Sequence, residues 1–192
     1  MVEGDRERWD RVHAESHDED SPSAFLQNLF QQFSESVPRG RALDIACGKG
    51  RNALFLAQQG FDVTAIDISP IGLEVARRRA ERMSLSISWQ RADLEKIQLE
   101  EGCYDLVADF NYLQRSLFPR ITKSLRPGGA VVFETFLIDQ QTIGQPKNPD
   151  YLLGHNELLN AFRDLRVLWY REGKFTDGGA PAFRASLFAQ KE

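Results

Sequence analysis

A regular alternation of short apolar runs with amphipathic segments begins at Arg41 and constrains the fold more than any other feature. The apolar runs have the length of buried strands, and they fall at 43–46, 61–66, 85–89, 104–110 and 129–136. Repeated β-α-β units need crossover connections, which make successive strands parallel and place helices on both faces of the sheet. We therefore expect an α/β fold with a doubly wound, mostly parallel sheet.

Local capping signals mark where the helices of this pattern begin and end. A helix over 52–59 is followed by Gly60, the residue type that most easily adopts the left-handed conformation after a helix. Ser69 and Pro70 predict an N-cap and a first turn for the next helix, which runs to about Met83. A further helix over 117–125 connects the last two parallel strands, and a Pro-Gly-Gly turn follows it.

The end of the chain departs from this rhythm. A long polar loop over 138–154 and a short helix over 157–162 precede two strands, at 167–175 and 183–190. The connection between these strands is so short that they must be antiparallel neighbours. The complete Rossmann-like sheet is therefore predicted to have seven strands and to end in an antiparallel hairpin.

The first 22 residues differ in composition from the rest of the chain. They are acidic and polar, and after Val2 their only large apolar residues are Trp9 and Val12. We expect a tail or a mobile helix that acts as a lid through Trp9, followed by one domain over 23–192. That domain begins with a helix over 23–33, in which the phenylalanines and leucines share one face.

Composition limits the partners of the chain. Its net charge is −4 and its pI is about 5.5, so a phosphate backbone would be repelled. No apolar stretch approaches the length of a membrane span, and Cys47 and Cys103 form neither a disulfide framework nor a metal quartet. We expect a cytoplasmic protein with a small-molecule substrate, no metal, no nucleic-acid or membrane partner, and a monomeric or weakly dimeric state.

A glycine turn after the first strand is the strongest indication of a ligand. Gly48-Lys-Gly50-Arg-Asn-Ala53 fits the G-x-G-x-x-A pattern of dinucleotide sites, and Asp67 follows where a ribose-binding acid is expected. Asp44, however, ends the strand beneath the turn, where its carboxylate would repel the pyrophosphate of NAD. S-adenosylmethionine has no phosphate and carries an ammonium and a sulfonium, so the same acid would attract it.

Several segments carry a resemblance to a known family. Ala42-Leu-Asp-Ile-Ala-Cys-Gly-Lys-Gly50 resembles motif I of the class I S-adenosylmethionine-dependent methyltransferases, and the likeness continues through Asp67, Arg91-Ala-Asp93-Leu94, Tyr104-Asp-Leu-Val107 and Arg126-Pro-Gly-Gly129. The segment after Gly50 is similar to the small-molecule branch that includes the TehB-type tellurite-resistance and thiopurine methyltransferases. One departure is Ala46, which stands where the family usually has the first glycine of motif I.

The resemblance assigns cofactor contacts to residues at successive strand ends. Asp44 would lie near the methionine ammonium, and Gly48 and Gly50 would let the backbone approach the cofactor closely. Asp67 would accept hydrogen bonds from the ribose hydroxyls. Ile68 would pack on one face of the adenine, and Asp93 and Leu94 would bind its edge. Phe110 would offer its carbonyl to the ammonium. Arg51 would either bind the cofactor carboxylate or lie on the surface.

The acceptor is less constrained, because methyl transfer mainly requires donor and nucleophile to be held in reactive geometry. Asn111 and Tyr112 are the catalytic candidates by position, and residues 134–136 with the 138–154 loop are expected to shape the mouth of the site. The His-Arg pair of the TehB branch is missing from the segment 173–176, which disfavours tellurite, whereas Arg184 matches a basic residue of that branch.

We therefore expect in-line methyl transfer to a thiol, a metalloid oxyanion or a small metabolite. An NAD-dependent oxidoreductase and a non-catalytic cofactor-binding module remain the alternatives at this point.

Overall fold

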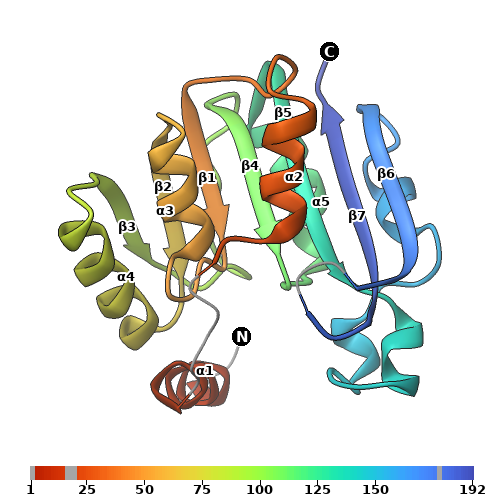
Figure 1. Ribbon diagram of the computed structural model, residues 1–192, viewed down its shortest axis with the longest axis horizontal. Coiled ribbons are helices and arrows are strands. Elements are labelled where there is room, and N and C mark those ends of the chain that lie inside the picture. The colour runs from red at the N-terminus through yellow and green to blue at the C-terminus, as the bar shows by residue number, and fades with distance from the viewer. Residues whose placement is uncertain (1–2, 16–20, 177–178) are drawn as a thin grey trace.

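The computed structural model describes residues 3–15, 21–176 and 179–192 (Figure 1). The strands are β1 Arg41–Ile45, β2 Asp62–Asp67, β3 Ile87–Arg91, β4 Tyr104–Phe110, β5 Leu125–Phe136, β6 Arg166–Phe175 and β7 Ala182–Gln190. The α-helices are α1 Glu3–Glu15, α2 Ala24–Gln32, α3 Arg51–Gln58, α4 Pro70–Arg82, α5 Phe118–Ser124 and α6 Glu157–Ala161. Short 3-10 turns are η1 Arg115–Leu117, η2 Ile138–Thr142 and η3 Pro149–Tyr151.

The strands form one seven-stranded sheet in the order β3-β2-β1-β4-β5-β7-β6. The pairs among the first five strands are parallel, whereas β7 runs antiparallel to both β5 and β6. The predicted fold class and the closing hairpin are thus confirmed. The hairpin is folded back so that β7 lies between β5 and β6, which leaves β6 at the edge.

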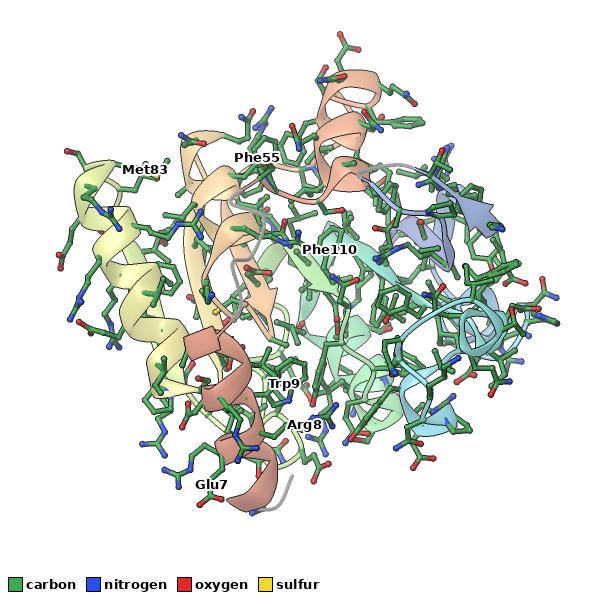
Figure 2. All side chains as sticks on the ribbon, turned by 60° about the horizontal axis from the view of Figure 1, so that its bottom comes forward. Glu7, Arg8, Trp9, Phe55, Met83 and Phe110 are labelled. Atoms are coloured by element: carbon green, nitrogen blue, oxygen red, sulfur yellow. The ribbon has the colours of Figure 1, made fainter. Side chains whose placement is uncertain are left out.

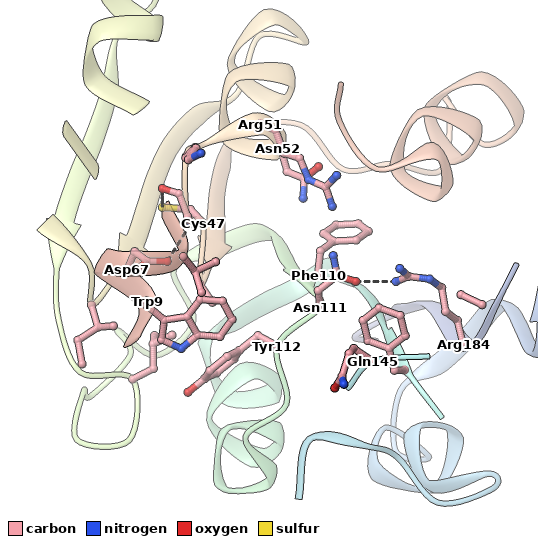
Figure 3. A pocket seen from close by; sticks show the side chains of 18 of the residues that line it. Trp9, Cys47, Arg51, Asn52, Asp67, Phe110, Asn111, Tyr112, Gln145 and Arg184 are labelled. Carbon is pink, nitrogen blue, oxygen red and sulfur yellow. Dashed lines mark hydrogen bonds between the residues drawn. The ribbon is translucent and has the colours of Figure 1, made fainter. Parts of the chain in front are cut away.

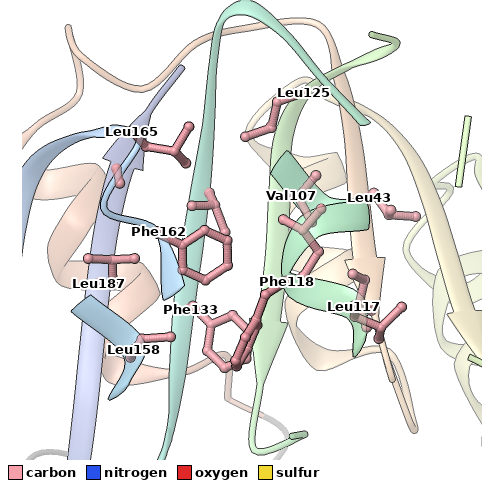
Figure 4. Packing of buried hydrophobic residues seen from close by; sticks show 14 of the residues in the cluster. Leu43, Val107, Leu117, Phe118, Leu125, Phe133, Leu158, Phe162, Leu165 and Leu187 are labelled. Atoms are coloured by element: carbon pink, nitrogen blue, oxygen red, sulfur yellow. The ribbon is translucent and has the colours of Figure 1, made fainter. Parts of the chain in front are cut away.

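Side chains alternate across the central strands and divide the core into two clusters. On β1, Leu43 and Ile45 face the cluster that contains α5 and α6, whereas Ala42 faces the cluster that contains α2 and α3. In the first cluster, the rings of Phe118, Phe133 and Phe162 pack together with centroids 5.5–6.0 Å apart (Figure 4). This period of two on buried strands explains why both faces of the sheet need a layer of helices.

The capping signals of the sequence act as predicted. The hydroxyl of Ser69 accepts a hydrogen bond from the Gly72 N–H at 3.1 Å, with Pro70 in the first turn of α4. Gly60 has a φ of +89° directly after α3. These local interactions place the end of α3 just before β2 begins and the start of α4 just after β2 ends.

Some boundaries differ from the sequence-based expectation. β3 occupies 87–91 instead of 85–89, because residues 84 and 85 still close the end of α4 through hydrogen bonds to Ala80 and Glu81. β5 begins at Leu125, so the Pro127-Gly-Gly turn lies within the strand and not before it. The pairing with β4 shifts register there, between Tyr104 and Leu106, which accommodates the turn.

The amino-terminal segment forms α1, which packs against α4 near the carboxyl ends of the parallel strands (Figure 1). The link from α1 to α2 includes residues 16–20, which lie outside the described part of the chain. Within the described ranges, none of the helices combines the length and the apolar character that a bilayer crossing requires.

Candidate functional site

A cavity of about 640 Å³ lies at the carboxyl edge of the sheet, beneath α1. Two walls face each other across it (Figure 3). The first wall comes from the segments that follow β1, β2 and β3, together with α1, the start of α3 and one residue of α4. It contains Trp9, Val12, Ala46, Cys47, Gly48, Lys49, Arg51, Asn52, Asp67, Ile68, Arg79 and Leu94. The second comes from β4, β5, β7 and the loop after β5, and contains Phe110, Asn111, Tyr112, Phe136, Gln140, Gln145, 180–182 and Arg184.

The glycine turn after β1 is built from left-handed residues. Gly48 and Gly50 have φ values of +53° and +77°, and Ala46 also has a positive φ of +51°. A left-handed conformation costs a residue with a side chain about 1–2 kcal/mol, which a glycine avoids. The alanine therefore adopts the backbone shape that the family's glycine would adopt, and the turn is kept at an energetic cost.

Gly50 does not line the cavity, and its structural role is packing. A Cβ atom at this position would lie 2.8 Å from the Trp89 ring and 2.9 Å from the Ala76 Cβ. Glycine is thus required here for the close approach of the turn to β3 and α4. Arg79 of α4 also donates to the Lys49 carbonyl at 3.2 Å, which ties the same turn to that helix.

Asp67, at the end of β2, holds the turn and lines the cavity. Its Oδ2 accepts from the Gly48 N–H at 2.8 Å, and its Oδ1 accepts from the Ser69 N–H at 2.8 Å. Each carboxylate oxygen has two lone pairs, so both oxygens keep acceptor capacity toward the cavity. Two backbone donors therefore fix the side chain in place, and its oxygens can still accept hydrogen bonds from hydroxyl groups in the cavity.

Asp44 lies beneath the turn and is only 1% exposed. Within the described chain, no group hydrogen-bonds to its Oδ2. Burial raises the pKa of Asp44 to about 7, against the opposing effects of the Ala53 N–H and the Arg51 charge. A cation bound beside this buried carboxyl group would favour its ionised form and would pair with it.

Asp109, near the end of β4, is a second buried acid close to Asp44. Neither of its carboxylate oxygens has a hydrogen-bond partner among the described residues. Burial raises its pKa well above the ordinary value, and the charge of Asp44 adds to the effect. The two acids therefore make the floor beneath the turn a place where a cation would be stabilised.

The apolar part of the first wall follows the next two strand ends. Ile68 and Leu94 line the cavity there, and Phe110, the last residue of β4, lines it from the second wall. Asp93 does not line it, because its Oδ1 accepts from the Glu95 N–H at 3.0 Å and its Oδ2 lies 3.4 Å from the Lys96 Nζ. This aspartate therefore caps the turn after β3 in the present arrangement.

The second wall centres on Asn111 and Arg184. Asn111 has a φ of +60°, and its side-chain oxygen accepts from Arg184 Nη1 at 2.5 Å (Figure 3). Asparagine tolerates the left-handed region better than most residues, so the strained backbone is kept at moderate cost. Tyr112 lies beside them and contributes an aromatic surface facing Trp9 in the same view.

The loop after β5 is more ordered than a polar loop would suggest. Gln140 is only 5% exposed, and its amide donates to the Gln145 carbonyl at 2.9 Å and accepts from the Phe183 N–H at 2.8 Å. Outside the cavity, His155 lies 2.6 Å from Asp139, and this hydrogen bond raises the pKa of the histidine. The loop is thus fastened to β7 and across its own two ends.

Trp9 and Val12 bring α1 into the first wall of the cavity, and Figure 2 shows Arg8 and Trp9 on the inner side of the helix. The Ser69 hydroxyl donates to Asp10 at 2.5 Å, which joins α1 to the start of α4. On the opposite side, Arg8 lies 5.5 Å from the Tyr151 ring centre and donates to its hydroxyl at 3.4 Å. Helix α1 therefore spans both walls.

Most of the residues proposed from the sequence meet around this one cavity. Asp44, Gly50 and Asp93 do not line it, for the reasons given above, and the other cofactor and catalytic candidates do. Of residues 134–136, which were expected to shape the mouth, only Phe136 lines the cavity, because Glu134 and Thr135 are buried. Sequence reasoning gave no site role to Asn52 or Arg79, and it expected the 138–154 loop at the mouth without naming Gln140. Asn52 accepts from the Ser23 N–H at 2.9 Å and so joins α2 to the start of α3, a contact between segments that no local pattern announces.

Comparisons with known proteins agree with this arrangement. A methyltransferase-domain family matches residues 42–129. The chain is 33% identical over 156 residues to a ubiquinone biosynthesis O-methyltransferase of Methylocella silvestris, covering 67% of this chain and 61% of that protein. It is 25% identical over 186 residues to the probable S-adenosyl-L-methionine-dependent methyltransferase TehB of Haemophilus influenzae, covering 85% and 65%. The chain thus spans less than two thirds of the length of these relatives.

The fold is also similar to a solved structure. The crystal structure of TehB from Haemophilus influenzae superimposes with a TM-score of 0.77 at 20% identity, covering 96% of this chain and 67% of that one. At this identity the match concerns the fold alone.

Proposed function

Because the chain belongs to the class I S-adenosylmethionine-dependent methyltransferases, we propose that it transfers a methyl group from that cofactor to a small nucleophilic acceptor. The observation that carries the proposal is the convergence of Asp67, Ile68 and Leu94 on one cavity, beside a glycine turn that covers Asp44, a buried acid whose Oδ2 has no hydrogen-bond partner within the described chain. Carboxylates and apolar side chains are the groups that bind a cationic nucleoside.

The residues present fit the family's cofactor. Asp44 would face the ammonium group, since one of its oxygens has no partner within the described chain and the site is deeply buried. Asp67 would bind the ribose hydroxyls, and Ile68 and Leu94 would enclose the adenine. A pyrophosphate would instead meet the two buried acids beneath the glycine turn, which disfavours a nicotinamide dinucleotide.

When bound, the cofactor would supply a methyl group on a sulfonium; the acceptor's lone pair would form the new bond to carbon, the electron pair of the S–CH₃ bond would stay on sulfur, and the acceptor's proton would pass to water. The side chains of the second wall then have to position the acceptor and exclude solvent. Asn111 and Tyr112 are proposed to contact it, and helix α1 is proposed to act as a lid over the cavity through Trp9.

Calorimetric titration tests the proposal directly. We expect S-adenosylhomocysteine to bind and NADH to fail to bind, and we expect release of S-adenosylhomocysteine when S-adenosylmethionine is supplied with a panel of small thiols, phenols and amines. Binding of NADH alone would favour an oxidoreductase. Tight binding of S-adenosylhomocysteine without turnover on any acceptor would favour a non-catalytic module.

A further inference from the structure

Arg184 places a guanidinium group in the second wall of the cavity, at the start of β7. Its side chain is 23% exposed, and its Cζ lies 4.1 Å from the centre of the Phe136 ring. Nη1 donates to the Asn111 side chain at 2.5 Å. The group is therefore held on one flat face by an aromatic ring and along one edge by an amide, which fixes its plane relative to the cavity (Figure 3).

A buried acid outside the cavity lining fixes the same guanidinium from behind. Glu134 of β5 has a side chain that is 9% exposed, and its Oε1 lies 3.8 Å from Arg184 Nη1. Its Oε2 accepts from the Ser186 hydroxyl at 2.6 Å and lies 3.7 Å from Arg171 Nη2. The Ser23 hydroxyl also donates to Oε1, at 3.4 Å. Glu134 thus joins α2, β5, β6 and β7 at the base of Arg184.

The surroundings of Arg184 in the cavity combine aromatic surface with neutral amides. Phe136 and Tyr112 contribute the aromatic faces, and Asn111 and Gln145 contribute the amides. Asp67 is the acidic side chain among the described lining residues, and it belongs to the opposite wall. A ligand bound against the second wall would therefore meet flat apolar groups together with an oriented guanidinium.

We infer that the methyl acceptor is a small organic acid whose carboxylate pairs with Arg184 and whose carbon skeleton packs against Phe136 and Tyr112. This inference rests on the proposed function, because it concerns the acceptor half of the same cavity. The planar fork of a guanidinium matches a carboxylate, and the aromatic walls favour a carbon skeleton over a bare inorganic oxyanion. The carboxylate is the anchor, and the nucleophile is a separate thiol, hydroxyl or amine. Glu134 is a positioning residue.

Binding to the protein saturated with S-adenosylhomocysteine tests the anchor without knowledge of the nucleophile. The probes are three acid and amide pairs, namely acetate with acetamide, benzoate with benzamide, and phenylacetate with phenylacetamide. We expect at least one acid to bind about tenfold or more tightly than its amide, as a charged hydrogen bond implies. Equal affinities within every pair, or binding of none of the six compounds, would overturn the inference.

Variants then assign the preference to the named side chains. Arg184→Gln should abolish the preference for acids, and Glu134→Gln should reduce it while Glu134→Asp restores part of it. Arg163→Gln is the matched control, because Arg163 is 80% exposed and its ion-pair partner is Asp164. An unchanged acid-to-amide ratio in Arg184→Gln would contradict the assignment.

Turnover supplies an independent measurement with S-adenosylmethionine as methyl donor. We expect faster methylation of 3-mercaptobenzoate than of 3-mercaptobenzamide, with the difference lost in Arg184→Gln. Methylation of tellurite with rejection of every organic acid would overturn the inference while leaving the methyltransferase proposal intact. Failure of S-adenosylhomocysteine to bind at all would instead overturn the proposed function, so the two failures are distinguishable.

Discussion

The two walls of the cavity are built in different ways. The first wall follows the ends of β1 and β2 and the turn after β3, and backbone N–H groups of these neighbouring turns fix its key side chains, as at Asp67. The second wall joins Asn111 to Arg184, residues separated by 73 positions in the chain, through side-chain contacts. The geometry of the first wall therefore depends on the backbone fold, whereas the geometry of the second wall depends on a few side chains and can change with few substitutions.

The largest expected effect concerns the first wall. Asp67→Ala should weaken S-adenosylhomocysteine binding by about 100-fold or more, because two hydrogen bonds to a charged group contribute roughly 3–6 kcal/mol. Calorimetric titration measures the loss. Asp62→Ala, at the exposed start of the same strand, is the control, and unchanged affinity in Asp67→Ala would remove the cofactor from this wall.

The stability of the folded protein is expected to depend on pH through Asp44. Its pKa is raised to about 7 in the folded protein, so the folded state keeps a proton that the unfolded chain has already lost. Stability should therefore fall as the pH rises from about 4 to 7, by at most about 4 kcal/mol in total. Asp44→Asn should flatten this slope in denaturant titrations at pH 5 and pH 8, and Asp109→Asn controls for the neighbouring acid.

The same group couples pH to binding. An ammonium partner favours the ionised form of Asp44, so S-adenosylhomocysteine affinity should increase as the pH rises toward 7 and level off above it. Proton release on binding, measured by calorimetry in two buffers of different ionisation enthalpy, checks this expectation. Proton uptake would contradict it.

A smaller effect is expected from the second wall, and it tests whether the walls are independent. Gln140→Leu should lower stability by about 1–3 kcal/mol, because the Phe183 N–H and the Gln145 carbonyl lose their partner. Affinity for S-adenosylhomocysteine should stay unchanged. Gln141→Leu is a matched control at an exposed neighbouring position. A parallel loss of cofactor affinity would show that the walls are coupled.

The smallest expected effect concerns the helix that spans both walls. Arg8→Ala removes a hydrogen bond and a cation–π contact to Tyr151, which at an exposed site together are worth about 1 kcal/mol. S-adenosylhomocysteine should therefore dissociate a few-fold faster, as stopped-flow tryptophan fluorescence would measure. Arg11→Ala is the control on the exposed side of α1. Identical dissociation rates would argue against a lid that is fastened at this point.

Sequence reasoning succeeded where a local signal exists. Ser69 and Gly60 marked helix ends because a cap acts within one turn of the chain, and the continuous apolar runs indicated strands because the central strands are buried on both faces of the sheet. It placed β3 two residues too early, because the closing turn of α4 extends into an apolar segment that reads equally well as strand.

The sequence by itself determined the parallel sheet, the closing hairpin and the position of Asp67 at a strand end, because these depend on short apolar runs and on local turn signals. Only the tertiary structure decided that Asp44 is buried beneath the wall, that Gly50 serves packing, and that Glu134 lies behind Arg184. These contacts form between segments that are far apart in the sequence. Their free energy depends on both partners together, and no local sequence pattern links the two.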